Sequence, residues 1–185
     1  MSALAENVGG ECGIAMGNPQ HWDEIYSGKG PEYVSWYQKQ PSLSLELIGN
    51  TGIAKDAAII DVGGGASRLV DFLLDEGYSD LAVLDWSAVA LEQSRRRLGQ
   101  KADMVQWFHS DIRGFEPPRR FALWHDRALF HFLTDPDDRS RYLETLRRTL
   151  VPGGAVIIAA FAPEGPPKCS DLDVVRYDEH SLMRE

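Results

Sequence analysis

The sequence predicts a single α/β domain with a doubly wound, mostly parallel sheet and helices on both faces. After Asp56, short and nearly continuous apolar runs alternate with helical stretches, as expected for strands buried on both faces of a parallel sheet. The 185 residues suit one domain with a substantial core, and 43% hydrophobic with 25% charged residues is the composition of a globular protein.

Five strands are expected to alternate with helices through right-handed crossovers. The strands are predicted at residues 57–62, 81–85, 104–109, 121–125 and 155–161. Helices are predicted at 67–76, at 87–98 with Ser87 as N-cap, and after Asp135, where Pro136 occupies the first helical position. Gly77 and Gly99 are placed to end the first two helices, and residues 152–154, Pro-Gly-Gly, to end the third.

The chain ahead of this alternation is expected to have two parts. Residues 1–20 are rich in glycine and small residues without periodicity, which predicts a flexible tail. The domain is expected over 21–185, opening with short helices within 21–50 that carry Trp22 and Tyr26 on one face.

Charge and composition exclude several classes of function. The net charge of −9 repels phosphate backbones and anionic lipids, so neither nucleic acid nor a membrane is expected as a partner. No apolar run is long enough to span a bilayer. Two cysteines are too few for a disulfide framework or a metal cluster, so no metal is expected and a reducing cytoplasm is the predicted location.

A glycine-rich turn follows the first predicted strand. It reads Asp61-Val62-Gly63-Gly64-Gly65, and in an open α/β sheet the carboxyl edge of the strands is where ligands bind. Glycines there let backbone atoms approach a ligand closely. The alternative is a tight strand-to-helix turn without a ligand.

The acid beside this turn favours one cofactor over another. A dinucleotide site would need a glycine at position 68, which is Arg68, and an acid nearby would repel pyrophosphate. S-adenosylmethionine has no phosphate and carries an ammonium and a sulfonium, so a carboxylate at position 61 suits it electrostatically. S-adenosylmethionine is therefore the predicted cofactor.

Further cofactor contacts are expected at the ends of the second and third strands. Asp85 can accept hydrogen bonds from both ribose hydroxyls. Trp86, the next residue, is also predicted to bind the cofactor. Asp111 is placed to bind the adenine amino group, with Ile112 in apolar contact with the ring. The alternatives are an anion at a helix N-terminus for Asp85 and an ordinary turn residue for Asp111.

The order of these features resembles the class I S-adenosylmethionine-dependent methyltransferases over about residues 21–177, which implies a Rossmann-like fold and methyl transfer. Residues 124–129, followed by Asp138-Arg139 and Tyr142, are more narrowly similar to thiopurine S-methyltransferase-like enzymes, which have Trp-Asp-Arg there, so that His125 is an added residue. In the family, aromatic residues of the N-terminal segment fold over the cofactor. Trp22, Tyr33 and Trp36 are the candidates here, with packing against the core as the alternative.

Candidate catalytic residues follow the fourth strand: His125, Asp126 and Arg127, with His131 just beyond. His125 could take a proton, and Asp126 could orient an amine or the cofactor's methionine end. An Asp126 to Arg127 pair that only fixes the loop is the alternative. The expected acceptor is a small molecule, with a protein lysine or amino group, a non-catalytic S-adenosylmethionine-binding module and a nucleotide-dependent dehydrogenase as alternatives.

The family resemblance also predicts an incomplete C-terminus. Class I methyltransferases usually finish with a strand hairpin after the helix that follows strand five, and this chain is expected to lack it. A truncated product, or an edge completed by self-association through strand five, would account for the difference. A last helix is expected to begin near Asp178.

Overall fold

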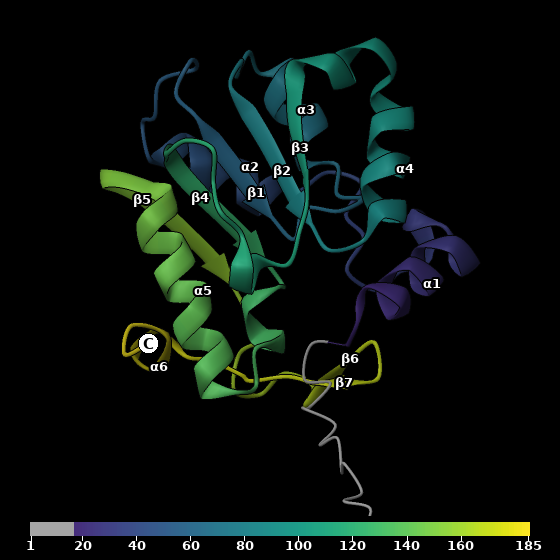
Figure 1. Ribbon diagram of the computed structural model, residues 1–185, viewed down its shortest axis with the longest axis vertical. Coiled ribbons are helices and arrows are strands. Elements are labelled where there is room, and N and C mark those ends of the chain that lie inside the picture. Colours follow the sequence, from purple (N-terminus) through teal and green to yellow (C-terminus); the bar gives the residue numbers. More distant parts are fainter. Residues whose placement is uncertain (1–16) are drawn as a thin grey trace, which may run out of the picture.

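The computed structural model describes residues 17–185, and its centre is a five-stranded parallel sheet (Figure 1). The predicted tail over residues 1–20 lies mostly outside the described residues. The strand order is β3-β2-β1-β4-β5, as a doubly wound topology requires. The strands are β1 (Ile59–Val62), β2 (Leu81–Asp85), β3 (Val105–His109), β4 (Phe121–Arg127) and β5 (Leu150–Ala159).

Helices cover both faces of this sheet, which confirms the predicted fold class. One apolar cluster joins the sheet to α2 (Ser42–Asn50), α3 (Leu69–Asp75) and α4 (Ala88–Leu98). The other joins it to α5 (Pro136–Thr149). Consecutive residues of a strand point to opposite faces, so Ile59 of β1 contributes to the first cluster and Ile60 to the second.

The predicted capping residues are confirmed. Ser87 accepts a hydrogen bond from the Ala90 amide at the start of α4, and Asp135 does the same from the Asp137 amide at the start of α5. Asp178 caps α6 (Glu179–Leu182). These contacts are local along the chain, so they follow from residue type and spacing alone.

Residues 152–154 do not separate α5 from the last strand as predicted. β5 already begins at Leu150, opposite Phe121, and its register then shifts so that Ala155 pairs with Leu123. The Pro-Gly-Gly segment is therefore a bulge within β5, where Gly153 has a φ of 76°. A Cβ on Gly154 would lie 3.0 Å from the Ala122 carbonyl oxygen of β4, which favours glycine there.

The two ends of the described chain pack beside the sheet (Figure 1). α1 (Pro19–Lys29) lies against α4, and η1 (Pro31–Tyr33) follows it. After β5, which lies at one edge of the sheet, β6 (Lys168–Cys169) and β7 (Leu172–Asp173) form a separate two-stranded antiparallel ribbon. Among the described helices, none has the length and apolar character needed to cross a membrane.

A buried polar network ties β4 to α5. The Tyr142 hydroxyl donates to Oδ2 of Asp126 at 2.7 Å and accepts from Nε1 of Trp124 at 2.8 Å. None of the three side chains is exposed to solvent. Burial raises the pKa of the Asp126 carboxyl to about 6, although the Tyr142 bond and the amides of Leu129 and Phe130 counteract this rise.

Tyr142→Phe is expected to lower the free energy of unfolding by about 1 to 3 kcal/mol, because it leaves an indole N–H and a carboxylate oxygen buried without a partner. Urea unfolding measures the change. Tyr33→Phe is the control, since Tyr33 is 78% exposed, and its effect should stay within about 0.5 kcal/mol. Equal stability of the two variants would contradict a stabilising role for the network.

Candidate active site

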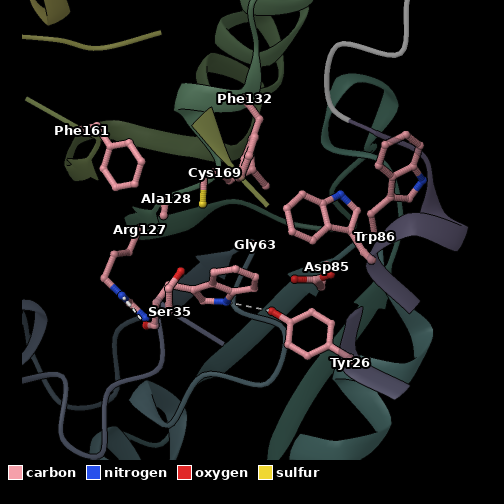
Figure 2. A pocket seen from close by; sticks show the side chains of 13 residues that line it. Tyr26, Ser35, Gly63, Asp85, Trp86, Arg127, Ala128, Phe132, Phe161 and Cys169 are labelled. Atoms are coloured by element: carbon pink, nitrogen blue, oxygen red, sulfur yellow. Dashed lines mark hydrogen bonds between the residues drawn. The ribbon is translucent and has the colours of Figure 1, made fainter. Parts of the chain in front are cut away.

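A cavity of about 140 Å³ opens at the carboxyl edge of the sheet (Figure 2). Four parts of the chain form its walls: the N-terminal segment 22–36, the ends of β1 and β2, the loop after β4, and the segment around β6. Six aromatic side chains contribute to the lining, and among its described residues Asp85 is the only carboxylate. The site is therefore mostly apolar, and its charged lining residues are Asp85 and Arg127, which lie on opposite sides of it in Figure 2.

A smaller cavity of about 30 Å³ lies beside the first, around the glycine turn. Asp61, Gly64 and His125 line this second cavity. Tyr26, Trp36, Gly63 and Arg127 border both. Nε1 of Trp36 donates to the Tyr26 hydroxyl at 3.2 Å, so these two rings that border both cavities are bonded to each other.

The glycine turn carries two carboxylates directly against its backbone. A Cβ on Gly64 would lie 2.5 Å from Oδ2 of Asp61, and a Cβ on Gly65 would lie 2.7 Å from Oδ2 of Asp85. Gly63 and Gly65 also have positive φ angles of 69° and 42°. Side chains at Gly64 and Gly65 would displace the two acids, whereas a side chain at Gly63 would meet Leu129.

Asp85 is a buried carboxylate with bonding capacity to spare. Its Oδ1 accepts from the Ser87 amide at 2.7 Å. Burial raises the pKa of its carboxyl to about 7 despite the Ser87 bond, and the charges of Asp61 and Asp23 add to the rise. A ligand that donates hydrogen bonds to Oδ2 would therefore relieve an unfavourable charge.

Helix α1 of the N-terminal segment is hydrogen-bonded to the start of α4, close to Asp85. Asp23 of α1 accepts from the Ser87 hydroxyl at 2.6 Å and from the Val89 amide at 3.3 Å. The Trp22 ring lies edge-on to Trp36, with 6.1 Å between the ring centroids. Ser87 thus joins α1, the start of α4 and Asp85, and α1 contributes aromatic rings to the cavity wall.

The three candidate catalytic residues of β4 are divided between two faces because a strand alternates: His125 and Arg127 border the same smaller cavity, and Asp126 points to the other side. His125 is buried, and its ring nitrogens lie 2.7 Å from Oδ1 of Asp61 and 3.0 Å from the Ser44 hydroxyl. Asp126 points to the opposite face, accepts from the Tyr142 hydroxyl and lines neither of the two cavities, so its catalytic role stays a prediction. Arg127 borders both cavities and donates to the Trp36 carbonyl at 3.2 Å.

Three predicted cofactor contacts lie away from the two cavities. Asp111 pairs both carboxylate oxygens with the Arg113 guanidinium, which in turn bonds Asp138. Ile112 is buried in the core. Tyr33 is 78% exposed and does not cover the site as expected. The adenine contacts predicted for Asp111 and Ile112 stay predictions.

Sequence reasoning missed several residues of the site. Ser44 lies on α2, and a serine in a helix gives no signal of its long-range partner. For Tyr26, the sequence indicated only its position on the same helical face as Trp22. Phe132 lines the cavity from the turn after β4, and Phe161 and Cys169 line it because the C-terminal segment folds back against that turn, where the Val175 amide bonds the His131 carbonyl.

His131 is buried between aromatic rings rather than facing the cavity. It contacts Phe132 and Phe161 at centroid distances of 4.4 and 4.7 Å. Burial lowers the pKa of its imidazole to about 4, so the ring is neutral near pH 7. In residues 17–185, no three or more His, Cys, Asp or Glu side chains are grouped to hold a metal ion.

Comparison with known proteins identifies a family. A family model described as a methyltransferase domain matches residues 59–154. A Bos taurus eEF1A lysine and N-terminal methyltransferase is 26% identical over 156 residues, which are 80% of this chain and 22% of that protein. A Danio rerio EEF1A lysine methyltransferase 2 is 24% identical over 162 residues, covering 78% of this chain and 69% of that protein. The chain thus spans about a fifth of the length of the first relative.

Solved structures share the fold at low identity. A glycopeptide N-methyltransferase, MtfA, complexed with S-adenosylmethionine, has a TM-score of 0.60 at 24% identity and covers 72% of this chain and 60% of its own. A methyltransferase from Geobacter sulfurreducens, in complex with S-adenosylhomocysteine, has a TM-score of 0.60 at 18% identity and covers 81% and 59%. Both likenesses support the fold described above.

Asp85→Asn is expected to change how the stability of the ligand-free protein depends on pH. Folding raises the pKa of this carboxyl from 3.8 to about 7, so the folded state binds more protons between these values and wild-type stability falls as pH rises through that window. The variant lacks this loss and should be more stable than wild type by about 1 to 3 kcal/mol at pH 8, with a smaller difference at pH 5.

Urea unfolding at both pH values measures this effect, with the exposed Asp103→Asn as the matched control. If the free energy of unfolding changes equally between the two pH values in Asp85→Asn and wild type, the charge at position 85 does not destabilise the folded protein.

Proposed function

Because the chain belongs to the methyltransferase-domain family, we propose that it binds S-adenosylmethionine at the carboxyl edge of its sheet and transfers the methyl group to an amine. One observation carries the proposal: the glycine turn seats two buried carboxylates, Asp61 and Asp85, beside an aromatic cavity. Such a site offers negative charge and apolar surface to a cationic ligand without phosphate.

The residues present fit the parts of this cofactor. Asp85, with Oδ2 at the turn, would accept hydrogen bonds from the ribose hydroxyls, and Trp86 beside it would contact the adenine ring. Asp61 and Arg127 both border the smaller cavity, so they offer opposite charges to the ammonium and carboxylate of the methionine end. When bound, the cofactor supplies an electrophilic methyl group on a sulfonium.

The remaining wall of the larger cavity suits an amine acceptor. It is formed by Leu129, Phe132, Phe161 and Cys169, beyond the residues assigned to the cofactor. Aromatic faces attract an ammonium group and its methylated products. The names of the relatives point the same way, since they include a lysine and N-terminal methyltransferase and a glycopeptide N-methyltransferase.

The lining also indicates how the amine would become nucleophilic. An ammonium must lose a proton before its lone pair can attack, and an apolar site lowers the pKa of an amine by desolvation. Among the described residues that line the larger cavity, Asp85 is the only acid and is assigned to the ribose, so the proton would leave to solvent through the cavity opening. The chain's own contribution is then alignment and exclusion of water from the attacking nitrogen.

Several finer expectations remain proposals. A free small molecule and a lysine side chain both present the same amine, so both stay open as acceptors. A sulfur acceptor, as the narrower resemblance to thiopurine S-methyltransferase-like enzymes implies, is named by none of the relatives reported above. A non-catalytic S-adenosylmethionine-binding role, a cytoplasmic location and association through β5 also stay predictions.

Asp85→Ala is expected to weaken S-adenosylhomocysteine binding by about 1 to 3 kcal/mol, because charge-assisted hydrogen bonds to the ribose are lost. Isothermal titration calorimetry measures the change, with Asp103→Ala as the exposed control. NAD should produce no binding heat with the wild-type protein. Unchanged affinity in Asp85→Ala would remove this residue from the binding site.

Methyl transfer from labelled S-adenosylmethionine is expected to lysine-containing peptides or free amines and not to thiols. The label recovered in each acceptor class measures the preference. Transfer to thiols alone would contradict the amine assignment. Binding of S-adenosylhomocysteine without transfer to any class would favour the non-catalytic alternative.

A further inference from the structure

Three buried side chains form a hydrogen-bonded chain from α2 to the glycine turn. The Ser44 hydroxyl lies 3.0 Å from Nε2 of His125, and Nδ1 of that ring lies 2.7 Å from Oδ1 of Asp61. Asp61 and His125 are directly paired in the register of β1 and β4, so their side chains point to the same face of the sheet. Ser44 reaches them because α2 covers that face.

This arrangement uses every polar atom of the imidazole. A neutral ring that donates from Nδ1 and accepts at Nε2 satisfies Asp61 on one side and Ser44 on the other. His125 borders only the smaller cavity and not the larger one that would hold the acceptor. Its geometry therefore does not suit the proton transfer for which the sequence made it a candidate.

One carboxylate oxygen of Asp61 is fixed by a hydrogen bond, and the other lies beside the glycine turn. Oδ1 is bonded to His125, whereas Oδ2 lies where a Cβ on Gly64 would be 2.5 Å away. A carboxylate held through one oxygen cannot rotate without losing that bond, so its second oxygen keeps one direction. Resting on the proposed function, we infer that His125, held by Ser44, is a positioning residue that aims Oδ2 of Asp61 at the ammonium of the cofactor.

Two substitutions at position 125 separate the two arms of the chain. An asparagine amide reaches about as far as Nδ1 and can still donate to Asp61, whereas a glutamine amide extends about as far as Nε2 and retains only the contact with Ser44. His125→Asn should keep the Kd for S-adenosylhomocysteine within about threefold of wild type. His125→Gln should raise that Kd, and the KM for S-adenosylmethionine, about tenfold with kcat nearly unchanged.

Two further variants complete the comparison. Ser44→Ala removes the outer bond without adding bulk and should raise the Kd about threefold, which provides the test if a His125 variant fails to fold. Thr149→Val removes another buried hydroxyl, bonded to the Thr145 carbonyl at the end of α5, and should leave the Kd unchanged.

Equal Kd values for folded His125→Asn and His125→Gln, or a loss confined to kcat, would overturn the positioning role. A wild-type protein that fails to bind S-adenosylhomocysteine would instead overturn the proposed function itself. The two failures are therefore distinguishable.

Discussion

The central sheet is covered by helices on both faces, and this burial constrains every polar side chain within it. A charge removed from water must find a hydrogen-bonding partner or shift its pKa. Asp61 has a partner in His125, and Asp126 has one in Tyr142. Asp85 accepts from the backbone amides of Ser87 and Trp86, and its pKa is still raised to about 7 because burial outweighs these bonds. This acid also lines the larger cavity, where a ligand can reach it.

Strand alternation divides the polar residues of β4 between two tasks. His125 lies on the face covered by α2 and Asp126 on the face covered by α5. Asp126 holds the loop after β4 through the amides of Leu129 and Phe130, and this loop supplies part of the cavity wall. The residues that support the site and those that border it are therefore neighbours in sequence but separated by the thickness of the sheet.

Ser87 links the ligand side of the sheet to the N-terminal segment. Its amide binds Asp85, and its hydroxyl caps α4 and donates to Asp23 of α1. A displacement of the Asp85 side chain would therefore be transmitted to α1 through Ser87. Since α1 carries Trp22 and Tyr26 into the cavity wall, the aromatic cover and the buried acid are parts of one hydrogen-bonded unit.

The sequence by itself determined the positions of the first four strands, the glycine turn, the place of Asp85 at the end of β2, and the caps at Ser87 and Asp135. These features depend on contacts within a few residues, so spacing and residue type are sufficient. Only the tertiary structure decided that His125 pairs with Asp61 and Ser44, that Arg113 pairs with Asp138, and that residues 152–154 form a bulge. Those outcomes depend on strand order, register and the helix that covers each face, which arise from contacts between segments far apart in the chain.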